Sequence, residues 1–175
     1  MRFSPWTVPF LAIAAAAAAF IAYTGRAMPA LVASHFVASG AANGFMPRPV
    51  YLTLILVVCV GLPVALAFAT GAAVGRPSAR INLPNRDYWL APERRGATVA
   101  RLRTGILQFN VLLIVFLAYA HWLVVRANQV QPPMLPARHM IAGLLAFCAA
   151  LIVWMRRFAR GFGKSERTAG TLRRG

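Results

Sequence analysis

The chain has 175 residues, of which 59% are hydrophobic and only 13% are charged. A soluble domain averages about 25% charged residues, so this composition excludes a soluble fold and predicts an all-α protein embedded in a membrane. The chain has 19 basic residues and 3 acidic ones, a balance that would suit a nucleic-acid-binding protein. The bases stand only between long apolar runs, however, which excludes that class. The length fits a single membrane domain over residues 1–175.

The first apolar run extends over residues 8–25 and carries no charge, so it is just long enough to cross the hydrocarbon layer. A basic start before an apolar stretch also resembles a signal peptide. Because Met28 and Pro29 interrupt a small-residue cleavage site, we expect an uncleaved first helix.

The second run covers residues 50–74 and is long enough to span with some tilt. Pro63 lies inside it and predicts a kink in the preceding turn, from Cys59 to Pro63. Gly71 and Gly75 form a GxxxG pair, which is typical of a close helix contact.

Two further runs, residues 105–125 and 136–155, complete four predicted transmembrane helices. Gln108 and Asn110 in the third run are expected to make hydrogen bonds between helices. His121 lies near the end of that run beside Trp122, where we expect a residue of the aromatic belt at the membrane interface.

The basic residues predict the orientation of the chain. Fifteen of the 19 fall on one side of the predicted spans. This side holds the N-terminus, the loop over residues 76–103 and a basic tail over residues 156–175. The other four fall on the opposite side. By the positive-inside rule the fifteen lie in the cytoplasm, so both termini face inward. The uncompensated charge predicts contact with the lipid bilayer, and with anionic lipid at the cytoplasmic face.

The outer loop, residues 28–49, is one of two segments with a distinctive sequence. Pro29 is suited to open a short helix whose apolar face would hold Leu31, Val32, His35 and Phe36. Gly40 would end that helix, and Asn43-Gly44 is a turn dipeptide. The loop either caps the bundle with a surface helix or faces a ligand or partner.

The inner loop, residues 81–95, contains Asp87 and Glu93, two of the three acidic residues of the chain. Each is expected to pair with a nearby guanidinium, that of Arg86, Arg94 or Arg95. Pro92 suits a helix start, and that helix could run without a break into the third span. Tyr88 and Trp89 would lie at the headgroup level. The loop is either a fixed elbow at the interface or a docking surface for a cytoplasmic partner.

Both loops resemble segments of a family of uncharacterised bacterial membrane proteins. The outer segment, Pro29, His35-Phe36, Gly40 and Asn43-Gly44-Phe45, is similar to that family's signature. The inner segment, Pro84-Asn85, Asp87-Tyr88-Trp89 and Pro92-Glu93-Arg94, resembles a motif of some members. The signature also occurs in the larger Sdp-type immunity and signalling proteins, which protect bacteria from a secreted peptide toxin. The resemblance implies a bacterial inner-membrane protein and makes these residues candidate binding or structural positions.

The sequence offers little chemistry for catalysis. No carboxylate lies in an apolar run, and there is no phosphate-binding loop or His-Glu-x-x-His motif. The three histidines and four of the six methionines fall on the outer side, and such groups bind copper, but no two histidines share a ligand spacing. We therefore expect no cofactor or metal.

The leading prediction is a non-catalytic inner-membrane protein with a binding or accessory role through its two loops. Its partner would be a membrane protein or a second copy of the chain. The alternatives are an immunity or signalling protein against a secreted peptide, and a metal-handling protein or enzyme that uses the outer histidines and methionines.

Overall fold

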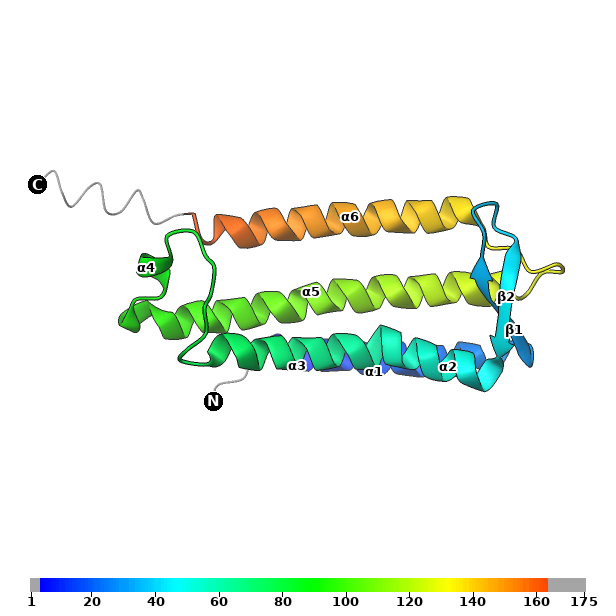
Figure 1. Cartoon of the computed structure of the whole chain (residues 1–175), viewed down its shortest axis with the longest axis horizontal. Coiled ribbons are helices and arrows are strands. Elements are labelled where there is room, and N and C mark those ends of the chain that lie inside the picture. The colour runs from blue at the N-terminus through cyan, green and yellow to red at the C-terminus, as the bar shows by residue number, and fades with distance from the viewer. Residues whose placement is uncertain (1–3, 164–175) are drawn as a thin grey trace, which may run out of the picture.

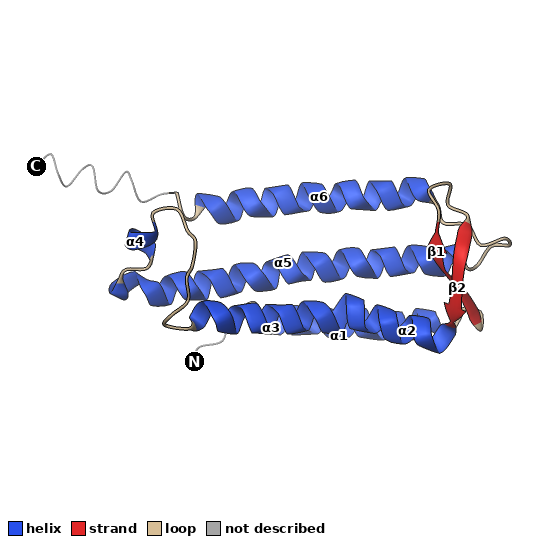
Figure 2. Ribbon diagram, in the orientation of Figure 1, coloured by secondary structure: helices blue, strands red, loops and turns tan. Residues whose placement is uncertain are grey.

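The computed structural model describes residues 4–163. Long helices run side by side along the molecule (Figure 1). They are α1 (Thr7–Gly25), the run of α2 (Arg48–Leu56), η1 (Val57–Gly61) and α3 (Leu62–Gly75), then α5 (Pro92–Ala127) and α6 (Ala137–Arg160). The strands β1 (Leu31–Phe36) and β2 (Ala42–Pro47) form a hairpin across one end of the helices, the hairpin end (Figure 2). The short helix α4 (Arg86–Trp89) lies at the other end, the elbow end.

Within the described residues, four helical segments are long and apolar enough to cross a membrane: Thr7–Gly25, Arg48–Gly75, Pro92–Ala127 and Ala137–Arg160. This confirms the four predicted apolar helices. The third begins at Pro92 and continues unbroken to Ala127, as the position of that proline predicts. The fourth extends to Arg160, so the first residues of the predicted tail are helical; residues 164–175 lie outside the described part of the chain.

The core forms where α1, α3 and α5 meet. Phe10, Ala14, Ala17 and Ile21 of α1 are all buried, and their spacing of four, three and four residues places them on one face of the helix. The two alanines let the α1 backbone approach its neighbours closely, as small residues do in membrane helices. Around them gather Ala67, Leu107 and Ile114. The Ala-rich composition of the first span therefore produces a closely packed three-helix core.

The irregular turn predicted before Pro63 is present as the π-helical segment Val57–Gly61. Proline lacks a backbone N–H, so a regular helix cannot complete its hydrogen bonding in the turn before Pro63. The wider π turn absorbs this mismatch without ending the span. Cys59 lies in this turn and is buried.

The GxxxG pair of α3 makes a close contact, as predicted, but the group it admits is a guanidinium. The Nε of Arg103 on α5 donates a hydrogen bond of 2.9 Å to the carbonyl of Gly71. A Cβ at Gly75 would collide with the same guanidinium. Gly75 thus leaves room beside α3 for a charged group of α5, and the carbonyl of Gly71 accepts its hydrogen bond.

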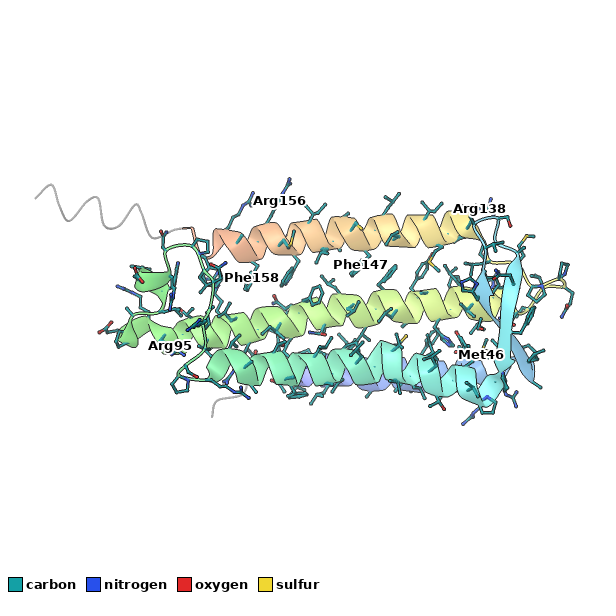
Figure 3. All side chains as sticks on the ribbon, in the orientation of Figure 1. Met46, Arg95, Arg138, Phe147, Arg156 and Phe158 are labelled. Carbon is teal, nitrogen blue, oxygen red and sulfur yellow. The ribbon has the colours of Figure 1, made fainter. Side chains whose placement is uncertain are left out.

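Helix α6 stands apart from this core. None of its residues is buried, and it packs mainly along α5. Two glycines mark where the helices touch: a Cβ at Gly105 would overlap the ring of Phe158, and one at Gly143 would overlap the ring of Tyr119. Figure 3 shows Phe147 and Phe158 pointing from α6 toward α5. Large rings against glycines therefore set the distance between these helices.

We predict that Gly105→Ala destabilises the protein. The Phe158 ring that it would meet lies between Trp154 and Phe162, with ring centroids 5.3 and 5.2 Å away, so it has little room to move. Overpacking of this kind costs about 1–3 kcal/mol. Thermal unfolding in mild detergent would measure the effect.

Gly96→Ala is the matched control, because a Cβ at Gly96 on the same helix has nothing within 4 Å. Replacing a helical glycine by alanine at such a position gains about 0.5–1 kcal/mol. Equal melting temperatures for the two variants would contradict the proposed α5–α6 contact.

Candidate functional site at the hairpin end

The outer loop folds as a β-hairpin, so the predicted surface helix at Pro29 is wrong. Strands β1 and β2 pair antiparallel, with Leu31 opposite Pro47 and Ala33 opposite Phe45. A helix of so few residues is marginal on its own, whereas pairing the strands satisfies their backbone groups directly. Val32 on the inner face is buried, and Met46 (labelled in Figure 3) packs against the same cluster as Val32.

Gly40, rather than Asn43-Gly44, makes the turn. Its φ of 90° is a left-handed conformation that favours glycine, and the amide of Val37 donates to the Ala41 carbonyl across a short hairpin loop. Asn43 and Gly44 lie within β2 instead. Gly44 is opposite His35, whose Cβ would lie 2.9 Å from a Cβ at that position, so the glycine lets the strands meet there.

Asn128, just after α5, fixes β1 to the helices. The amide N–H of Ala33 donates to Asn128 Oδ1 over 2.8 Å, and Asn128 Nδ2 donates to the Ala33 carbonyl over 2.9 Å. The same Nδ2 donates to the Val124 carbonyl of α5. The side-chain amide thus replaces a third strand along the edge of β1. Sequence reasoning missed Asn128, which no local pattern distinguishes from an ordinary loop residue.

Both ends of the hairpin are also attached. At its tip, the amide of Leu135 donates to the Gly40 carbonyl over 2.8 Å, and Ala41 forms a bridge with Met134. At its base, Arg48 Nη1 donates to the Met28 carbonyl over 2.9 Å. The hairpin is therefore held by the α5–α6 connection, by α5 and by the start of α2.

The outer face of the hairpin, which we call the hairpin surface, is exposed. Its exposed residues are Leu31, His35, Asn43, Phe45 and Pro47, while Ala33 opposite Phe45 is buried. Leu31 and Phe45 are 59% and 51% exposed, and His35 Nδ1 lies 2.5 Å from Asn43 Oδ1. Among the residues predicted from the sequence, His35 and Asn43 come together here, while Phe36 is half-buried and Gly40 and Gly44 shape the strands. The surface combines apolar side chains with a hydrogen-bonding pair on a fixed backbone.

His121 lies beneath the hairpin and is fully buried, so its predicted place in an aromatic belt is wrong. Its Nε2 is 2.9 Å from Thr24 Oγ1 at the end of α1, and its Nδ1 is 2.9 Å from the Tyr51 hydroxyl of α2. The Tyr51 ring stacks on the imidazole, with centroids 5.8 Å apart, and Phe20 meets it edge-on. One histidine therefore joins three of the apolar helices.

The partners of His121 define one neutral hydrogen-bond chain. Thr24 Oγ1 donates to the Phe20 carbonyl over 2.7 Å, which leaves the hydroxyl oxygen as an acceptor for an Nε2–H group. Nδ1 then carries no proton and accepts from Tyr51. In this tautomer, every polar side-chain atom of Thr24, His121 and Tyr51 has a hydrogen-bond partner, which suits a structural histidine in an apolar setting.

The inner loop forms a compact elbow against α5 and α6. Trp89 Nε1 donates to the Phe162 carbonyl over 3.0 Å, and the Trp89 carbonyl accepts from Thr98 Oγ1 over 2.8 Å. Pro92 and Glu93 start α5, and Asn85, with φ of 52°, precedes α4 after Pro84. The motif residues of this loop thus shape the connection between α3 and α5.

The predicted ion pairs of Asp87 and Glu93 do not form within residues 4–163. Both acids are exposed, so water solvates them at little cost. The neighbouring arginines bind other groups: Arg94 lies 4.0 Å from the centroid of the Tyr88 ring, and Arg95 donates to the carbonyls of Arg76 and Pro77.

The remaining candidates for chemistry lie apart. Among the described residues, no three His, Cys, Asp or Glu side chains gather as a metal site. Gln108 accepts from Trp154 Nε1 over 3.3 Å, which confirms its predicted bond between helices. Asn110 instead donates to the Ile106 carbonyl of its own helix, so the predicted interhelical bond is wrong there.

We predict that Asn128→Ala loosens the hairpin. The substitution leaves the buried amide and carbonyl of Ala33 without partners, at a cost of about 1–3 kcal/mol. Hydrogen exchange of residues 31–36 should quicken, and the melting temperature in detergent should fall. Gln129→Ala is the control, because this neighbour is exposed. Unchanged exchange in Asn128→Ala would mean that the side-chain amide does not hold β1.

No protein-family model, curated protein or solved structure matches this chain. The hairpin surface, the His121 cluster and the elbow are therefore interpreted from their own geometry.

Proposed function

We propose that the protein is a non-catalytic, multi-pass protein of the bacterial inner membrane that binds a polypeptide partner through the hairpin surface. The observation that carries the proposal is the rigid attachment of an exposed, partly apolar surface. Asn128, Arg48 and the α5–α6 connection hold the hairpin at three places, while Leu31 and Phe45 remain exposed. A backbone fixed before binding loses less conformational entropy when a partner arrives.

The edge of β2 supports a polypeptide as the partner. The amide and carbonyl of Ala33 point away from β2 and bond to Asn128. In an antiparallel pair, two residues that face each other either exchange backbone hydrogen bonds or both direct their backbone groups outward. The amide and carbonyl of Phe45, opposite Ala33, are therefore directed away from β1. An extended chain can add to such an edge by backbone hydrogen bonds. The resemblance to the signature of Sdp-type immunity proteins favours a secreted peptide as one partner of this kind.

The charge distribution supports an orientation with the hairpin end in the periplasm. The elbow end carries most of the arginines, and the hairpin end carries few. In this orientation the hairpin surface meets partners from outside the cell, and the elbow lies in the cytoplasm. The elbow would then serve mainly to fix α6, with Tyr88 and Trp89 at the headgroup level.

Cysteine accessibility tests the orientation. Single cysteines at Asn43 and Ala97, both exposed, would be placed in a background without Cys59 and Cys148. An impermeant thiol reagent should label position 43 but not position 97 in intact cells with a permeable outer membrane. The reverse pattern would overturn the proposed orientation.

A photoreactive residue at Phe45 tests the proposed role of the hairpin surface. We expect crosslinks from this position to a polypeptide, and we expect His35→Ala to weaken them while the protein stays folded. An exposed change of this kind alters stability by about 0.5 kcal/mol or less. Tyr23, a 74% exposed aromatic residue on α1 outside the hairpin, is the matched control position.

The result would be negative if Phe45 gave no more polypeptide crosslinks than Tyr23. A His35→Ala variant that lost stability and crosslinks together would show that the histidine supports the fold rather than the contact.

A further inference from the structure

Helix α6 is attached to the rest of the protein near its two ends. At the elbow end, Arg101 Nη1 donates to the Gly161 carbonyl over 3.0 Å, and the Trp89 ring meets that of Phe162 at 5.3 Å. At the hairpin end, the Tyr119 hydroxyl donates to the His139 carbonyl over 2.8 Å. These contacts fix the position of α6 relative to α5.

Between the two attachments, aromatic rings separate the helices. Trp154 and Phe109 have centroids 5.8 Å apart, and Phe116 stacks on Phe147 at 4.7 Å. These ring pairs connect α5 and α6, and cavities remain beside the rings. Protein interiors are otherwise densely packed, so the voids beside the rings need an occupant.

The larger void has one charged end and one apolar end. A cavity of about 580 Å³ lies beside α5 and α6 near the elbow end. Arg101 and Arg157 line one part of it, with Thr104 and Gln108 further along α5. Val111, Leu112, Ala150 and Val153 line its apolar part, and Trp6, Gly105, Trp154 and Phe158 complete the lining. A second cavity of about 480 Å³, almost entirely apolar, continues from Leu112 and Ala150 toward the hairpin end.

The two cavities together form one groove between α5 and α6, since Leu112 and Ala150 line both. We propose that this groove binds one anionic phospholipid, with its phosphate at Arg101 and Arg157 and an acyl chain along the apolar part. Guanidinium groups are well suited to phosphate oxygens. Neither acidic residue of the described chain, Asp87 or Glu93, lines the cavity to neutralise these charges. Basic pockets between membrane helices are a recognised place for anionic headgroups.

The dimensions of the groove fit one leaflet. From Arg157 to Ala146, which lines the second cavity, α6 rises by about 16 Å at 1.5 Å per residue. Half of a hydrocarbon core about 30 Å thick is a similar length. A single acyl chain with a phosphate at one end matches the charge, the shape and the length together.

Native mass spectrometry of the full chain in mild detergent tests the proposal. The added lipids are phosphatidylglycerol and phosphatidylcholine with the same acyl chains. Arg157→Gln should weaken binding of phosphatidylglycerol by about fivefold, the usual contribution of one basic residue near a membrane surface. Arg156→Gln removes the same charge from the neighbouring residue, which points away from α5 (Figure 3), and it should bind phosphatidylglycerol like the unmodified protein.

A second pair of variants tests the acyl-chain part of the groove independently. Ala150→Phe places a ring where the two cavities meet and should reduce retention of both lipids. Ala149→Phe changes an exposed residue that lines neither cavity, and it should retain both. Inorganic phosphate should neither displace phosphatidylglycerol nor raise the melting temperature as the lipid does.

Equal effects of Arg157→Gln and Arg156→Gln would overturn the proposal, since binding would then follow net surface charge. Equal effects of the two alanine substitutions, or full competition by inorganic phosphate, would also overturn it, because the groove would then not hold an acyl chain.

Discussion

A polar group that a membrane helix carries into hydrocarbon must find its partner within the protein, because lipid tails offer none. The hairpin end is organised around this requirement. His121 bonds to Thr24 and Tyr51, and Asn128 bonds to both backbone groups of Ala33. Each contact joins segments far apart in the sequence. The few polar side chains near the hairpin end thus decide which helices meet there, while the apolar majority fills the space between them.

The two sides of α5 show two ways in which helices pack without a hydrophobic force between them. On the α1 side, Ala14 and Ala17 are small and the helices interlock closely. On the α6 side, Phe147 and Trp154 reach across to α5, so contact is made through rings. The first arrangement leaves a dense core, and the second leaves grooves that open toward the surroundings of the protein. Lipid can complete the second arrangement but has no place in the first.

The scarcity of acidic residues shapes the charged parts of the molecule. Arg48, Arg95, Arg101 and Arg103 each donate to backbone carbonyls, mostly near the ends of helices or in loops. Such bonds hold the guanidinium groups in place but leave their charge uncompensated. Most of the arginines lie at the elbow end, so the proposed lipid site is placed where the uncompensated charge is greatest. The hairpin surface itself contains no Lys, Arg, Asp or Glu side chain, which suits contacts through shape, apolar area and hydrogen bonds.

The sequence by itself determined the features that depend on neighbouring residues. Each apolar run specifies a helix, Pro63 specifies an irregular turn before it, and Pro92 specifies where α5 begins. The hairpin required the tertiary structure, because residues 31–36 could show an apolar face as a helix or as a strand. Pairing with β2 and the side-chain amide of Asn128, 95 residues after Ala33, favour the strand. The burial of His121 could not be predicted from the sequence either. Its position beside Trp122 predicts an interface residue, whereas in the structure α1 and α2 cover it. Pairing, burial and the spacing of α6 depend on contacts between distant segments, and hydropathy along the chain carries no information about them.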